Sequence, residues 1–151
     1  MNVQNVEGNK MEIVGLIGML VICSVEDVRR KEMHLLILLG FGVLGIGLHM
    51  AFRSMSIYEI LGGMLIGVIL LLLSILSDGK IGKGDGVLMV VTGTYLGFWN
   101  NLLLLWSATC LTGVFGLIVY FRRRQTDVEL PFAPFVLAAC MVGCVFQLMR
   151  G

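Results

Sequence analysis

The sequence contains few charged residues. Only 14% of its 151 residues are Asp, Glu, Lys or Arg, whereas 58% are hydrophobic. A soluble domain has roughly 25% charged residues, so this composition argues against a water-soluble fold and favours a chain whose apolar surfaces face lipid. Because a membrane-crossing helix needs about 20 apolar residues, a chain of this length has room for six or seven crossings at most. We expect no soluble domain within it.

The sequence also lacks the common patterns of metal, nucleotide and nucleic-acid sites. Its four cysteines form no Cys-x-x-Cys pair, and we predict neither a metal nor a cofactor. A net charge of +1 gives no basis for nucleic-acid binding. The glycine-rich stretch at 82–86 is not a phosphate-binding loop, because Asp85 follows Gly84 where that loop requires Lys. It is not a dinucleotide fingerprint either, because Val87 stands where glycine is needed.

Six apolar segments lie between polar breaks, and we expect each to form a transmembrane helix. They are Met11 to Val25, Leu35 to Phe52, Ile57 to Ser77, Gly86 to Trp99, Leu102 to Phe121 and Phe132 to Met149. The predicted fold class is all-α, a polytopic membrane protein with six transmembrane helices. A polar N-terminal tail, residues 1–10, is expected to precede the transmembrane domain, residues 11–151. No small-x-small cleavage site follows the first segment, so we expect it to remain in the mature protein.

Two pairs of glycines have a spacing that is typical of helix packing in membranes. Gly63-x-x-x-Gly67 lies in the third apolar segment and Gly93-x-x-x-Gly97 in the fourth. Small residues at this spacing let two helix backbones approach closely in lipid. We expect these glycines to serve packing and assign them no chemistry.

Basic residues gather on one side of the predicted membrane domain. That side collects Arg29, Arg30, Lys31, Lys80, Lys83, Arg122, Arg123 and Arg124. The other side has only Lys10, Arg53 and Arg150. Because Lys and Arg are retained in cytoplasmic loops, we expect the first side to be cytoplasmic and both termini to face outward.

Two acidic residues lie where an apolar segment meets a predicted cytoplasmic loop. Asp27 ends the first segment, and Asp85 precedes the fourth. Two carboxylates a few ångströms apart cannot both ionise cheaply, so one holds a proton near neutral pH. The charged group can then take a proton from water while the other donates to a peptide carbonyl. If the two helices pack side by side, this pair is a candidate catalytic site.

A simpler interpretation of the same residues is that they are solvated at the membrane interface. Asp85, near a helix start, could be only a cap or a partner of the helix dipole. Glu26, Glu32 and Asp78 meet the same positional criterion. Position alone therefore leaves the catalytic and the structural interpretations open. His34 is interpreted as a solvated interfacial residue.

Three stretches of the sequence together resemble a known family. Gly82-x-Gly84-Asp85 opens the fourth segment, and Asp27-Val28-Arg29-Arg30 ends the first. Leu130-Pro131-Phe132-Ala133-Pro134-Phe135 enters the last. In order and spacing these stretches resemble the type 4 prepilin peptidase family, a branch of the Gly-x-Gly-Asp intramembrane aspartic peptidases. The resemblance covers nearly the whole chain.

The resemblance implies a function and a set of site residues. Asp27 and Asp85 become the catalytic pair, and Gly82 and Gly84 shape the loop that presents Asp85. The implied activity is that of an aspartic endopeptidase in the cell membrane, which cleaves the leader of prepilin-like substrates near the cytoplasmic face. The implied partners are the prepilin-like protein and the lipid bilayer. The cytoplasmic region linked to N-methylation in larger members has no counterpart here, so we expect no methyltransferase activity.

The sequence departs from the family pattern at three places. Met33-His34-Leu35 stands where the family commonly has Ile-Pro-Asn, Val87 where it has Lys, and Ala133 where it has glycine. These changes bear on substrate class or activity rather than on fold. Two alternatives stay open: a non-enzymatic six-helix assembly factor or transporter, and an intramembrane aspartic peptidase closer to the presenilin or signal-peptide peptidase branch. The six-helix length and the Pro131 stretch argue against the latter.

Overall fold

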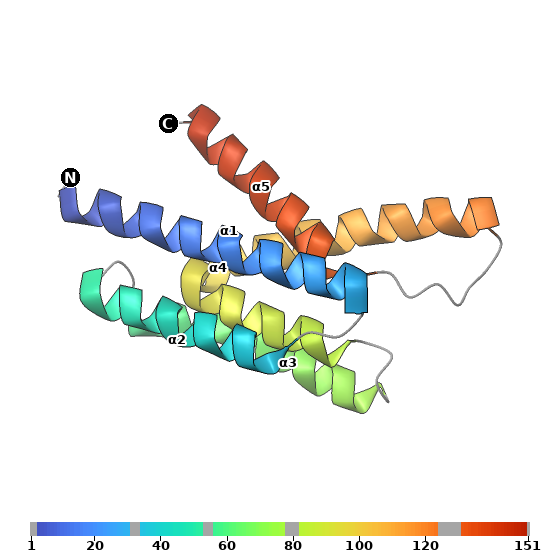
Figure 1. Ribbon diagram of the computed structural model, residues 1–151, viewed down its shortest axis with the longest axis horizontal. Helices are drawn as coiled ribbons and strands as arrows, with labels where there is room; N and C mark the ends of the chain where they lie inside the picture. Colours follow the sequence, from blue (N-terminus) through green and yellow to red (C-terminus); the bar gives the residue numbers. More distant parts are fainter. Residues whose placement is uncertain (1–2, 31–33, 53–55, 78–81, 124–130, 151) are drawn as a thin grey trace.

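The computed structural model describes residues 3–30, 34–52, 56–77, 82–123 and 131–150 (Figure 1). All regular secondary structure in these ranges is α-helical, which confirms the predicted all-α class. The helices are α1 (Val3–Arg30), α2 (Leu35–Phe52), α3 (Ile57–Leu76), α4 (Lys83–Arg123) and α5 (Ala133–Arg150). The first helix begins at Val3 and not at Met11, because the polar residues before the apolar segment continue the same helix.

The fourth and fifth predicted segments form one element, α4, which is interrupted at a single residue. Gly97 has φ 69° and ψ −173°, outside the helical region. A positive φ costs little only for glycine, which explains the residue at this point. Figure 1 shows the chain turning back here, so the two halves of α4 run in opposite directions. The described residues thus form five helical elements where six were expected, with the fourth divided at Gly97.

The polar break expected at residues 100–101 is helical, and its second residue is fully buried. The Nδ2 group of Asn101 donates to the carbonyl oxygens of Gly63 and Met89, each at 3.0 Å. The hydroxyl of Thr92 donates to Oδ1 of Asn101 at 2.8 Å. Buried polar groups are stable only when they are hydrogen-bonded, and these bonds satisfy the whole amide. Asn101 therefore ties the two halves of α4 to α3 rather than marking a loop.

The packing of α3 against the first half of α4 is backbone to backbone. A Cβ atom on Gly63 would collide with the carbonyl oxygen of Gly93, and one on Gly67 with the backbone nitrogen of Val90. A Cβ on Gly93 would in turn collide with the carbonyl group of Gly63. The close approach that the glycine spacing predicted is confirmed here for Gly63, Gly67 and Gly93. A Cβ on Gly63 would also lie 2.9 Å from the carbonyl carbon of Gly97, so Gly97 takes part in this packing as well as in the bend.

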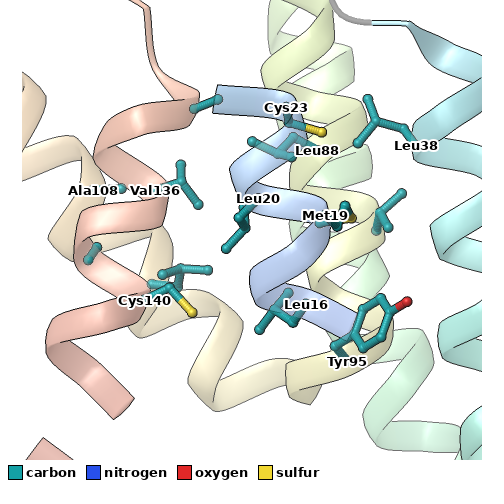
Figure 2. Close-up of a cluster of buried hydrophobic side chains, with 14 residues drawn as sticks. Leu16, Met19, Leu20, Cys23, Leu38, Leu88, Tyr95, Ala108, Val136 and Cys140 are labelled. Carbon is teal, nitrogen blue, oxygen red and sulfur yellow. The ribbon is translucent and has the colours of Figure 1, made fainter. Parts of the chain in front are cut away.

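A second contact region joins α1 to α2, α4 and α5 through side chains. Its most buried labelled members are Leu16, Met19, Leu20, Cys23, Leu38, Leu88, Tyr95, Ala108, Val136 and Cys140 (Figure 2). The four from α1, Leu16, Met19, Leu20 and Cys23, have the i, i+3, i+4, i+7 spacing that places them on one face of that helix. This face continues to Asp27, one turn beyond Cys23. Asp27 therefore lies on the face of α1 that packs against α2, α4 and α5.

Large apolar side chains cover the outer surface of the helices. Leu36 is 83% exposed, Leu76 79% and Met50 78%. In water such contiguous apolar surface would be costly, whereas lipid tails cover it without penalty. Among the described residues, two helices are long and apolar enough to cross a membrane, Ile57–Leu76 and Lys83–Arg122. Leu35–Ala51 and Ala133–Val145 are shorter apolar helices.

Candidate active site

Asp27 lies in the last turn of α1 and is bound by the start of α5. Its Oδ2 atom accepts a hydrogen bond from the backbone N–H of Ala133 at 3.0 Å. Ala133 is fully buried, and Asp27 is half-buried. This contact joins two parts of the chain that are more than 100 residues apart, so the fold and not the local sequence places the carboxylate.

Asp85 lies in the first turn of α4, next to the glycine that precedes the helix. Its backbone N–H donates to the carbonyl oxygen of Gly82 at 3.1 Å. A Cβ atom on Gly82 would lie only 2.7 Å from Oδ2 of Asp85, so a larger residue there must displace the carboxyl. Gly84 occupies the same turn and is half-buried. Gly82 therefore contacts the Asp85 carboxyl closely, whereas the proposed role of Gly84 in presenting it stays a prediction.

Asp85 is half-buried at the same end of the bundle as Asp27. Burial is the larger cause that raises the pKa of its carboxyl, and the negative charge of Asp27 adds to it, bringing the pKa to about 7. The site is formed by the C-terminal end of α1 and the N-terminal ends of α4 and α5.

Glu26 and His34 form a separate pair beside the aspartates. The Nδ1 atom of His34 lies 3.1 Å from Oε1 of Glu26. The backbone N–H of His34 also approaches Oε2 of Glu26 at 3.4 Å. The histidine side chain is 49% exposed, consistent with the interpretation of a solvated interfacial residue. The Glu26 carboxylate thus pairs with His34.

Several residues named from the sequence lie outside the described part of the chain. They are Lys31, Glu32, Met33, Arg53, Asp78, Lys80, Arg124 and Leu130. Among the described residues, no group of three or more His, Cys, Asp and Glu is arranged to hold a metal ion.

Two features of the structure were not anticipated from the sequence. One is the Ala133 N–H, a backbone group that no side-chain pattern reveals. The other is an ion pair far from the aspartates, where Nδ1 of His49 lies 3.1 Å from Oε1 of Glu12 with both side chains almost fully buried. A polar residue inside each of two apolar segments was the available signal for this pair.

Comparison with known families gives one match over nearly the whole chain. A model described as the type IV leader peptidase family matches residues 14–148, a range that includes both aspartates and Ala133. No curated protein and no solved structure matches the chain.

Proposed function

Because the chain belongs to the type IV leader peptidase family, we propose that it is an intramembrane aspartic endopeptidase that cleaves the leader of prepilin-like proteins. The family assignment implies a peptidase, and members of the family are membrane proteins. The observation that supports an aspartic mechanism is the raised pKa of Asp85, to which burial contributes most and the charge of Asp27 also contributes. In this proposal Asp27 and Asp85 are the catalytic pair.

The proposed reaction is hydrolysis of one peptide bond without a covalent intermediate. The ionised carboxylate takes one proton from water while the water oxygen bonds to the peptide carbonyl carbon. The protonated carboxyl gives its proton to the carbonyl oxygen, forming a tetrahedral diol. When the carbon–nitrogen bond breaks, the amine nitrogen receives the proton taken from water, and one diol hydroxyl returns a proton to the other carboxyl. The pair ends as it began, with one proton shared between two groups.

The half-burial of both aspartates supports this chemistry. Water must reach the scissile bond, and both carboxyls lie at helix ends with part of their surface exposed. Charges in such a position are screened less than in bulk water, so the two groups influence each other's proton. Gly82, without a side chain, leaves room for the carboxyl of Asp85 itself.

We further propose that the chain crosses the membrane six times, counting the two halves of α4 separately. Figure 1 shows both termini at the end of the molecule opposite the C-terminal end of α1, an arrangement that fits successive crossings. The positively charged side, which carries Arg29, Lys83 and Arg122, is then the cytoplasmic face of the cell membrane. Asp27 and Asp85 lie on this face, at the junction between a prepilin's leader and its hydrophobic helix.

The test is cleavage of a co-expressed prepilin from the same genome. A gel shift reports processing, and N-terminal sequencing of the product reports the bond that is cut. Wild type is expected to cut once, at the leader boundary, whereas Asp27→Asn and Asp85→Asn insert in the membrane but leave the prepilin intact. Normal cleavage by either variant would remove the catalytic assignment. Cleavage inside the transmembrane helix would contradict the substrate assignment.

A further inference from the structure

The first turn of α5 directs one backbone donor at Asp27. The N–H of Ala133, the first helical residue, lies 3.0 Å from Oδ2 of Asp27. Pro134 has no N–H, and the next two N–H groups donate to the carbonyl oxygen of Phe132 at 3.0 and 3.2 Å. The first N–H groups of a helix have no acceptor within the helix and need one elsewhere. Of these four residues, Ala133 is therefore the one whose N–H binds a group outside α5.

The two carboxyls differ in the hydrogen bonds they receive. Asp27 accepts the Ala133 N–H, whereas no residue in the described part of the chain donates to the carboxyl of Asp85. Asp85 lies at the N-terminal end of α4, whose dipole favours a negative charge, whereas Asp27 lies between the N-terminal end of α5 and the C-terminal end of α1, whose dipoles oppose each other, so the helix dipoles do not favour an ionised Asp27. The direct hydrogen bond does, because an N–H donor stabilises the charged form of a carboxyl over its neutral form.

Resting on the proposed peptidase function, we propose that the Ala133 N–H holds Asp27 in its ionised form, so that Asp85 carries the shared proton. As the water oxygen bonds to the carbonyl carbon, a water proton moves to Asp27 and the proton of Asp85 moves to the carbonyl oxygen. The pair of aspartates keeps one negative charge throughout. Ala133 does not touch the substrate in this scheme and is a positioning residue that acts through Asp27.

The proline-containing stretch at the start of α5 sets which N–H group binds Asp27. Phe132 accepts the hydrogen bonds that begin the helix, and Pro134 leaves the first turn without a competing donor. The helix therefore starts at the residue whose N–H meets Asp27. The deeper side chains of α5, such as Val136 and Cys140, pack against α1 and fix the distance between the two helices (Figure 2).

The first experiment removes the donor without removing the helix. Ala133→Pro lacks the N–H, and proline is well tolerated at the first position of a helix. With purified enzyme and the purified prepilin, kcat is expected to fall on the order of 10- to 100-fold, the range for a lost hydrogen bond to a charged group. The acidic limb of the pH–rate profile is expected to move to higher pH, and KM to change little. A limb that stays at the wild-type pH would overturn the proposal.

A matched variant separates the N–H from the methyl group. Ala133→Gly keeps the N–H and loses only the side chain, so its acidic limb is expected at the wild-type pH whatever its rate. A shift of the same size as in Ala133→Pro would assign the effect to packing and would contradict the inference.

The second experiment uses wild type and needs neither substrate nor activity. A diazo ester reagent esterifies protonated carboxyls, whereas an epoxide is opened by ionised carboxylates, and peptide mass spectrometry locates each label. At neutral pH we expect the diazo label on Asp85 and the epoxide label on Asp27. The reverse pattern, or equal labelling, would overturn the inference. If the labels fall as expected but wild type leaves the prepilin uncut, the proposed function fails and the proton assignment stands.

Discussion

The two aspartates are held by parts of the molecule that are built differently. Asp85 lies in the first turn of α4, which packs on α3 backbone to backbone. Gly63, Gly67 and Gly93 leave no space between these two helices. Asp27 ends a helix that is held by interdigitated side chains and, at the site itself, by one hydrogen bond to Ala133. The packing of α3 on α4 is rigid, because its contacts are made by backbone atoms, which have no rotamers to change. The packing of α1 depends on side chains, which can change rotamer.

The largest effect on this comparison is expected from a methyl group added between α3 and α4. Gly93→Ala places a Cβ against the backbone of Gly63, which must move. We expect a loss of about 2–3 kcal/mol in the free energy of unfolding, the upper part of the range for overpacking. The matched control is Gly113→Ala, because a Cβ there meets nothing within 4 Å. Unfolding in bicelles measures both, and equal stability of the two variants would contradict the rigid packing of α3 on α4.

The next effect is expected at the buried amide that ties α4 to α3. Asn101→Ala removes the hydrogen bonds to the carbonyl oxygens of Gly63 and Met89 and the one from Thr92, whose hydroxyl keeps its 3.2 Å bond to the carbonyl oxygen of Met89. We expect a loss of about 2–3 kcal/mol, since each unsatisfied buried group costs about 1–3 kcal/mol and partial relaxation recovers some of it. Thr92→Val removes only one of these bonds and should cost less in the same unfolding measurement. A larger cost for Thr92→Val would show that Asn101 is not the centre of the network.

A smaller effect, on activity alone, is expected beside Asp85. Gly82→Ala brings a Cβ to 2.7 Å from Oδ2 and displaces the carboxyl, while the packing of α3 on α4 is untouched. We expect kcat/KM for the prepilin to fall about 10-fold, which corresponds to about 1.4 kcal/mol of transition-state stabilisation. The unfolding free energy should stay within about 0.5 kcal/mol of wild type. A stability loss that matches the activity loss would contradict a local role.

The smallest effect is expected at the exposed pair beside Asp27. His34→Ala removes an ion pair in which the histidine is 49% exposed. Such pairs contribute about 0.2–1 kcal/mol at most, so we expect cleavage within about twofold of wild type. The prepilin cleavage rate at pH 6 and pH 8 measures this. A large loss would show that the Glu26–His34 pair, and not α5 alone, positions the end of α1.

Much of this arrangement was accessible from the sequence. Apolar segments predicted the helices, and Gly63, Gly67 and Gly93 predicted close packing. The break in α4 was predicted at residues 100–101 and lies at Gly97. Asn101 is a polar residue of the kind that is common in loops, and its hydrogen-bond partners on α3 and on the first half of α4 could not be predicted from the sequence. The extension of α1 to Val3 was missed because polar residues carry no periodic signal. The contact between Asp27 and Ala133 was inaccessible, since a backbone N–H has no sequence signature.

The central claim is that Asp27 and Asp85 act as one catalytic unit, and the most direct test is the prepilin cleavage rate of Asp27→Asn, Asp85→Asn and the double variant. Groups that act together are strongly non-additive, so each single change is expected to cost on the order of 1,000-fold or more and the double change no more than either. If the losses multiplied in the double variant, or if one single variant cleaved at the wild-type rate, the two aspartates would not be a pair.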